Sequence, residues 1–266
     1  MFEKITSPQN PKVKNVLHLE KASERRKQNL FIAEGFREVK LAFDAGFNFK
    51  YTFFCPEINN SYEYQLFIRQ ASSQSIVYEV TRAVFEKVAY RENSDGILAI
   101  AEAKYLKLAD IVLTDNPFII VLEKVEKPGN LGAVLRTADA AKVDAVLVCD
   151  PQTDIYNPNA IRSGIGCVFT NQVVCCTSEE ALLWLRNKKI KNYAAALTAE
   201  AFYHETSFVT PSAIIMGTEA DGLTEFWLKN ADAQIKIPMR GEIDSLNVST
   251  ATAIITFEAM RQRGFK

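Results

Sequence analysis

The sequence predicts an α/β protein made of two parts, the second of which has a mostly parallel sheet flanked by helices. Short runs rich in β-branched residues alternate with segments of helical periodicity, which is the pattern of strands and helices packed in layers. This alternation occurs twice, and a length of 266 residues allows two ordinary domains. Apolar residues make up 48% of the chain, so each part can bury a core.

The first series of elements lies within residues 1–104 and predicts a smaller α/β domain. It begins with a polar, basic stretch over residues 10–27 that predicts one helix. The following pattern predicts strands over 29–35, 49–55, 75–80 and 96–103, and helices over 36–46, 62–70 and 84–90.

Residues 105–115 predict a linker, and the second series of elements lies within residues 116–266. In a parallel sheet covered by helices, ligands bind beyond the carboxyl ends of the strands, so loops that follow strands are the first candidates for a site. The pattern predicts strands over 118–125, 145–149, 172–176, 192–197, 213–217 and 234–238, and helices over 131–142, 159–169, 179–189 and 246–263.

The composition limits the classes of function. A net charge of −1 argues against general electrostatic binding of nucleic acid, although residues 1–50 hold ten Lys and Arg against six Asp and Glu. No apolar run is long enough to span a membrane, and we expect no secretory signal. A basic cluster predicts either a solvated helix face or a modest RNA-binding arm; it consists of Lys21, Arg25, Arg26 and Lys27.

The cysteine and histidine content predicts neither a disulfide framework nor a metal site. The five cysteines include no CxxC pair, and their positions in apolar runs predict reduced, buried thiols in a cytoplasmic protein. His18 and His204 lie in no motif. The cysteines are Cys55, Cys149, Cys167, Cys175 and Cys176.

The loop EKPGNLG over residues 126–132 directly follows a predicted strand. Its proline and glycines allow a tight turn, and Asn130 can cap the next helix. Arg136 lies almost two helical turns further on and projects from roughly the same side. The spacing matches neither G-x-G-x-x-G nor a P-loop, so ordinary dinucleotide binding is disfavoured. A helix cap and a surface arginine explain these two residues equally well.

Two further loops follow predicted strands and also carry polar residues. Gly217 ends an apolar strand, where the lack of a side chain permits close approach of a ligand. Glu219 is expected at the N-terminal end of a helix, where a carboxylate favours the helix dipole. Ser245 and Asn247 lie where a loop enters the last helix, and both residue types cap helices. Each feature alone therefore has a purely structural explanation.

Together, three motifs in this order are more specific. The set N-x-G-x-x-x-R, G-T-E-x-x-G and I-P-M…S-L-N-x-S resembles that of the SpoU (TrmH-like) family of RNA ribose 2′-O-methyltransferases over residues 115–264. The N-terminal domain, with its NLFIAEGFREVKLA stretch, is similar to the RNA substrate-binding domain of many family members. The resemblance implies a deep trefoil knot in the C-terminal half, a homodimer and S-adenosylmethionine as cofactor.

The resemblance also implies roles for individual residues. The cofactor pocket would be lined by Gly217, Ile237, Leu246 and Leu197, with Ser245 and Asn247 beside the transferred methyl group. Arginine has no hydrogen-bond acceptor and a pKa above about 12, so we expect Arg136 to grip RNA phosphate and stabilise the alkoxide rather than act as a base. Glu219 would accept the proton or orient Arg136, while Asn130 and Asn247 fix the ribose.

The sequence departs from the usual family pattern at three positions, and it leaves alternatives open. Lys127 stands where many relatives have an acidic residue, Lys142 where a glycine often ends the helix, and Ala220 where a glycine often follows the glutamate. Ribosomal RNA is the expected substrate. The alternatives are transfer RNA, or a non-catalytic RNA-binding or ribosome-assembly factor with the same fold.

Overall fold

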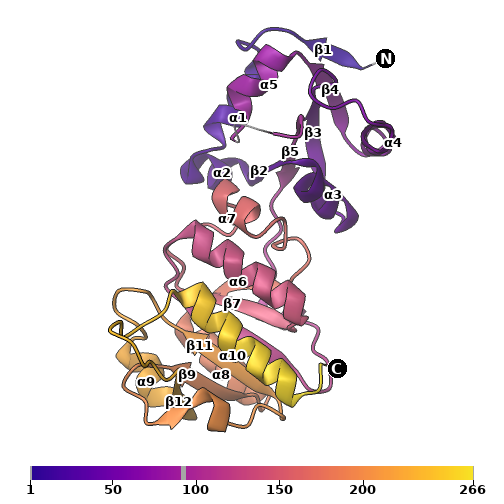
Figure 1. The fold of residues 1–266 in the computed structure, drawn as a ribbon. Coiled ribbons are helices and arrows are strands. Elements are labelled where there is room, and N and C mark those ends of the chain that lie inside the picture. The colour runs from indigo at the N-terminus through magenta and orange to yellow at the C-terminus, as the bar shows by residue number, and fades with distance from the viewer. Residues whose placement is uncertain (1, 91–93, 266) are drawn as a thin grey trace. The chain divides into compact units, whose positions relative to one another are not determined.

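The computed structural model describes residues 2–90 and 94–265, which fold into two compact units (Figure 1). The first unit contains the chain up to Lys104 together with Asp154–Thr170. The second contains Tyr105–Thr153 and the chain from Asn171 onward. Residues 154–170 therefore interrupt the second unit in sequence but pack with the first.

The first unit is built on a five-stranded sheet in the order β1-β4-β3-β5-β2. Strands β1, β4 and β3 are parallel, whereas β5 runs antiparallel to β3 and β2. The strands are β1 (Glu3–Ile5), β2 (Leu30–Glu34), β3 (Phe49–Phe54), β4 (Ile76–Val80) and β5 (Ile97–Glu102). The helices are α1 (Pro11–His18), α2 (Ala22–Gln28), α3 (Phe36–Asp44), α4 (Tyr62–Ala71), α5 (Arg82–Val88) and α7 (Pro158–Ser163).

The single helix predicted over residues 10–27 is wrong, because α1 ends at His18 and α2 begins at Ala22. Arg25 of α2 donates from Nη1 to the carbonyl oxygens of Leu19 (2.9 Å) and Glu20 (2.7 Å), which lie in the break. The arginine side chain thus satisfies carbonyl groups at the helix end that a continuous helix would bond along its own backbone.

Arg25 also forms a buried ion pair, so its assignment to a solvated basic face is wrong. Its side chain is 2% exposed, and its Nε lies 2.6 Å from Oδ2 of Asp154. Asp154 accepts a second hydrogen bond from the backbone N–H of Tyr156 (2.9 Å). The Tyr156 ring stacks on Phe31 of β2, with 4.6 Å between ring centroids. These contacts explain why residues 154–170 belong to the first unit.

The second unit is built on a seven-stranded sheet in the order β10-β12-β9-β11-β6-β7-β8, and all its neighbouring strands are parallel. Helices α6 and α10 adjoin on one face, and α8 and α9 adjoin on the other (Figure 1). The predicted mostly parallel sheet flanked by helices is thus confirmed; the threading of a knot stays a prediction.

The bounds of the second unit's elements follow the predicted alternation, with the two-residue strand β10 and the short helix α9 as additions. The strands are β6 (Phe118–Glu123), β7 (Ala145–Cys149), β8 (Val173–Cys176), β9 (Lys191–Ala195), β10 (Ala201–Phe202), β11 (Ser212–Met216) and β12 (Ala233–Lys236). The helices are α6 (Pro128–Ala141), α8 (Ser178–Asn187), α9 (Glu225–Asn230) and α10 (Val248–Gln262), with short 3₁₀ turns η1 (Leu108–Asp110) and η2 (Tyr203–Glu205).

Two local predictions need correction. The helix expected over 159–169 is only α7, because Ile165 and Gly166 adopt left-handed φ values of 47° and 84° that end it. Cys175 is exposed rather than buried, because successive residues of a strand face opposite sides and β8 is an edge strand. In the part of the chain that the structure describes, no helix is both long and apolar enough to cross a membrane.

Candidate active site

Three loops of the second unit meet at one edge of its sheet. They follow β6, β11 and β12, and because these strands are parallel, their carboxyl ends lie at the same edge. Side-chain hydrogen bonds link all three loops. The structure therefore brings together the three loops that the sequence identifies as candidates.

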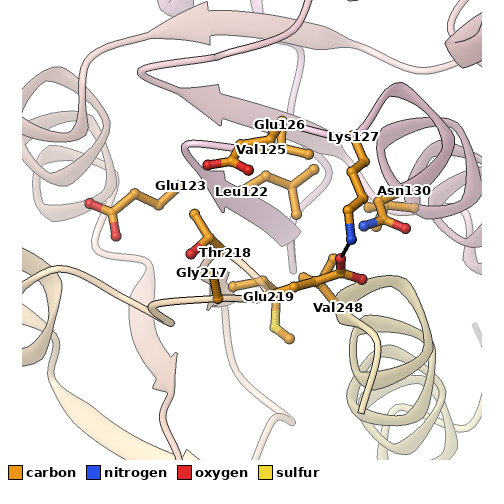
Figure 2. A pocket seen from close by; sticks show the side chains of 13 residues that line it. Leu122, Glu123, Val125, Glu126, Lys127, Asn130, Gly217, Thr218, Glu219 and Val248 are labelled. Atoms are coloured by element: carbon orange, nitrogen blue, oxygen red, sulfur yellow. Dashed lines mark hydrogen bonds and ion pairs between the residues drawn. The ribbon is translucent and has the colours of Figure 1, made fainter. Parts of the chain in front are cut away.

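Four side chains, which we call the polar cluster, form these links. The Lys127 ammonium forms an ion pair with Oε2 of Glu219 (Figure 2). Asn247 donates from Nδ2 to the other carboxylate oxygen of Glu219 and to Oδ1 of Asn130, 3.1 Å away in the second case. Three members of the polar cluster, Asn130, Glu219 and Asn247, are residues that the sequence predicts for the site.

The charges of the polar cluster are matched although the cluster is open to solvent. The Lys127 side chain is 66% exposed and the Glu219 side chain 24%. The hydrogen bond from Lys127 is the main cause that lowers the pKa of the Glu219 carboxyl, with smaller contributions from Asn130 and the backbone N–H of Val248. Glu219 is therefore an ionised hydrogen-bond acceptor at neutral pH.

A small cavity of about 140 Å³ opens beside the polar cluster (Figure 2). Lys127, Asn130 and Glu219 form a polar wall, and most of the remaining lining is apolar. Glu123 also lines this cavity, but both of its carboxylate oxygens accept hydrogen bonds from Thr224, at 2.8 and 2.6 Å. Its position is thus fixed by a structural contact, whereas Glu219 faces the small cavity from a loop.

A large cavity of about 510 Å³ lies on the other side of the loop after β11. All four predicted cofactor residues line it: Leu197, Gly217, Ile237 and Leu246. Ser245 lines it as well and donates to Oδ1 of Asp244 at 3.0 Å. The two cavities share the wall made of residues 216–220 and Val248. A volume of this size suits a nucleoside-sized ligand.

Gly217 is required by the geometry of the shared wall. A Cβ atom at this position would overlap the backbone of Gly222 and Leu223. The chain after Gly217 makes a tight turn in which Thr218 and Gly222 exchange backbone hydrogen bonds of 3.0 and 3.2 Å. Glu219 lies in this turn and α9 begins only at Glu225, so the expectation that Glu219 starts a helix is wrong.

The two asparagines of the polar cluster have different places on their helices. Asn247 is the N-cap of α10 and accepts a hydrogen bond from the backbone N–H of Ser249 at 2.9 Å, which confirms the predicted cap. Asn130 lies in the first turn of α6, whose N-cap is Lys127, so the cap predicted for Asn130 is wrong. Its side chain is consequently available to Asn247.

Arg136 lies apart from the polar cluster. It is an exposed residue of α6 and lines neither cavity. Within residues 2–90 and 94–265, the Arg136 side chain has no hydrogen-bond or ion-pair partner. It is therefore not hydrogen-bonded to Glu219, and its exposed guanidinium is open to an external ligand.

The sequence reasoning missed one member of the polar cluster and part of the large cavity. Lys127 was visible only as a departure from a family pattern, although it directly precedes the helix that carries Asn130. Ala195 ends β9, and Ala196 and Thr198 follow it. Strand β9 lies between β12 and β11 in the sheet, and this position at a strand end could have identified the three residues. No group of side chains in the described ranges is arranged to hold a metal ion.

Comparisons with known families match both units. The sequence model of the SpoU rRNA Methylase family matches residues 117–257, which include the polar cluster and all the residues that line the two cavities. The model of the MRM3-like substrate binding domain matches residues 10–99.

Individual relatives agree with these matches over most of the chain. The Bacillus subtilis protein named 23S rRNA (guanosine(2553)-2′-O)-methyltransferase RlmP is 30% identical over 96% of this chain and 98% of its own length. The protein of Pectobacterium atrosepticum named 23S rRNA (guanosine-2′-O-)-methyltransferase RlmB is 33% identical over 74% of this chain and 84% of its own.

Solved structures show the same likeness. The AdoMet-bound rRNA methyltransferase of Sinorhizobium meliloti has a TM-score of 0.89 and 30% identity over 98% of both chains. An RNA 2′-O ribose methyltransferase has a TM-score of 0.85 and 37% identity, covering 98% of this chain and 99% of its own.

Proposed function

Since the chain belongs to the SpoU rRNA methylase family, we propose that it transfers a methyl group from S-adenosylmethionine to a ribose 2′-hydroxyl of ribosomal RNA. One observation carries the proposal: a large cavity and a small cavity with one polar side share a wall at which Gly217 and Glu219 lie. This arrangement suits a methyl donor on one side and a hydroxyl acceptor on the other.

The large cavity fits the cofactor in its apolar lining and its charge. Leu197, Ile237 and Leu246 offer apolar surface for an adenine ring. Among the charged side chains of its lining, three are carboxylates and only Lys236 is basic, which suits the sulfonium and ammonium groups of the cofactor; the carboxylates are Glu219, Asp221 and Asp244. When bound, S-adenosylmethionine supplies the methyl group and leaves as S-adenosylhomocysteine.

The polar cluster supplies the acid–base chemistry. A ribose hydroxyl is a weak nucleophile until its proton is withdrawn, so the site needs an acceptor. We assign this role to the ionised carboxylate of Glu219, and we assign orientation of the ribose to Asn130 and Asn247. Arg136, whose guanidinium has no partner among the described residues, is assigned to an RNA phosphate.

The acceptor is inferred from the relatives. The B. subtilis and P. atrosepticum proteins are named for guanosine in 23S rRNA, and we propose a guanosine of ribosomal RNA for this chain. We further propose that the first unit binds RNA through the exposed Arg26 and Lys27 of α2, that the chain forms a homodimer, and that it acts in the cytoplasm. Light scattering of the purified protein tests the dimer.

A methyl-transfer assay tests the proposed function. The protein is incubated with labelled S-adenosylmethionine and unmodified ribosomal or transfer RNA, and the RNA is digested to nucleosides. Label in 2′-O-methylguanosine from ribosomal RNA is the expected result. Label found only in nucleosides from transfer RNA would show that transfer RNA, and not ribosomal RNA, is the substrate. Cofactor binding without label in either pool would favour the non-catalytic RNA-binding factor.

Cofactor binding is tested separately with Gly217→Ala. Because the added methyl group overlaps the backbone of the turn, the shared wall must shift, and we expect affinity for S-adenosylmethionine to fall by about tenfold or more. Gly241→Ala is the matched control, since a Cβ at Gly241 meets no atom within 4 Å. Calorimetry that finds equal affinities for the two variants would contradict the assignment of the large cavity.

A further inference from the structure

Lys127 is the member of the polar cluster to which the proposed reaction gives no role. Its ammonium is nevertheless bonded to Glu219, the proposed proton acceptor (Figure 2). From the family resemblance we expect an acidic residue at this position. The lysine found here is therefore a departure of this chain from the family pattern.

We propose that Lys127 is a positioning residue for methyl transfer, whose ammonium holds the Glu219 carboxylate ionised at the wall of the small cavity. The inference rests on the proposed function, because it concerns the same site. It concerns the orientation and ionisation of the proton acceptor before RNA binds, and it adds a residue that lies outside the three sequence motifs.

The geometry leaves Glu219 dependent on contacts from other loops. Glu219 lies in the tight turn between Thr218 and Gly222, whose own hydrogen bonds fix the backbone but not the glutamate side chain. Lys127 and Asn247 each bond one carboxylate oxygen. Two donors on two oxygens define the orientation of a carboxylate, whereas one donor permits rotation.

Lys127 is itself well placed to act as an anchor. It is the N-cap of α6, and Pro128 follows at the first helical position, where its ring fixes the backbone φ angle. The ammonium is therefore attached to the rigid start of a fourteen-residue helix. The same helix carries Asn130, which bonds Asn247, so both contacts of the carboxylate lead back to α6.

The charged groups that line the small cavity are mostly negative. Three of the four charged side chains are carboxylates, from Glu123 at the end of β6, Glu126 in the following loop and Glu219, and Lys127 is the fourth. Neighbouring carboxylates disfavour one another's ionised forms, and an ammonium opposes that effect. Removing the ammonium would leave carboxylates as the only charged side chains among the described residues that line the small cavity.

The direction of the pH effect follows from this arrangement. The pKa of Glu219 is lowered chiefly by Lys127, so the carboxylate stays ionised well into acidic solution. Without the ammonium this pKa rises towards its ordinary value. If Glu219 must be ionised to accept the proton, the acid limb of the rate profile then moves to higher pH.

The test is the pH dependence of kcat/KM for wild type and for Lys127→Met, with Lys124→Met as control. Lys124 is an exposed lysine three residues earlier and lines neither cavity. We expect Lys127→Met to lower kcat/KM about tenfold at neutral pH and to move the acid limb upward. Lys127→Arg, which keeps the charge, and Lys124→Met should retain the wild-type profile.

A double variant separates positioning from a direct contact with RNA. If Lys127 acts through Glu219, adding Lys127→Met to Glu219→Gln should cost little further activity. An unshifted profile in Lys127→Met, or an equal loss in both backgrounds, overturns the proposal. The Glu219 carboxyl can also be titrated by carbon NMR in wild type and Lys127→Met. Equal pKa values in the two proteins would overturn the proposal for Lys127, and this test needs no methyl transfer. A wild type that transferred no methyl group would count separately, against the proposed function.

Discussion

The first unit buries its arginine–aspartate pair, whereas the second unit leaves its lysine–glutamate pair at the rim of a cavity. The side chains of Arg25 and Asp154 are 2% and 8% exposed, and those of Lys127 and Glu219 are 66% and 24% exposed. Burial of charge costs solvation energy unless further hydrogen bonds offset it, and Arg25 has two such bonds to backbone carbonyls.

This difference indicates what each pair does. An exposed pair contributes at most about 1 kcal/mol to stability, so the Lys127–Glu219 pair matters mainly through the carboxylate that it holds in place. The Arg25–Asp154 pair binds a distant chain segment into the first unit and faces neither cavity of the second. The buried pair maintains structure and the exposed pair prepares chemistry. Breaking the buried pair should therefore lower stability, and breaking the exposed pair should lower activity.

The largest expected effect is the loss of stability when the buried Arg25–Asp154 pair is broken. Arg25→Met leaves the Asp154 carboxylate buried without its partner, and we expect a loss of about 3–5 kcal/mol in the free energy of unfolding. Denaturant unfolding followed by far-UV circular dichroism measures it. Arg26→Met, at the exposed neighbouring arginine, is the control and should change stability by less than about 0.5 kcal/mol. Equal losses in the two variants would remove the distinction between the pairs.

The second effect is the loss of activity when the exposed Lys127–Glu219 pair is broken. Glu219→Gln keeps the size of the side chain but removes the proton acceptor, so we expect kcat/KM to fall by about 10²-fold while the melting temperature stays nearly constant. Glu225→Gln is the control, because it makes the same chemical change in an exposed pair on α9 whose two residues line neither cavity. A large loss of stability in Glu219→Gln would show that the exposed pair is structural.

The smallest effect tests a pair of intermediate exposure, Glu258–Arg261 on α10, whose side chains are 13% and 66% exposed. Arg261 is the main cause that lowers the pKa of Glu258 to about 2. Because this value is below the unfolded one, the pair stabilises the fold above about pH 4.3 and loses that contribution as pH falls towards 2. Glu258→Gln should therefore lower stability at pH 7 by about 0.5 kcal/mol, and the difference should shrink in acid when urea midpoints are compared.

Patterns that are local in sequence could be predicted, and contacts between distant residues could not. The alternation of apolar runs and helices predicts the parallel sheet, and the position of Gly217 and Asn247 after strands predicts that their loops meet. The residues around Arg25 look like a solvated basic face, because its partner Asp154 is 129 positions away. Lys127 and Glu219 are separated by 92 positions, and only the folded sheet brings them together.

The segment Asp154–Thr170 gives the molecule an unusual modularity, because the chain passes between the two units three times rather than once. A fragment that starts at residue 116 would retain Tyr156 and Phe169 but lack Phe31, on which both rings stack. Exchange of the first unit between genes therefore requires two matched pieces of sequence, an N-terminal one and an internal one. This requirement links the inheritance of the first unit to that of the second.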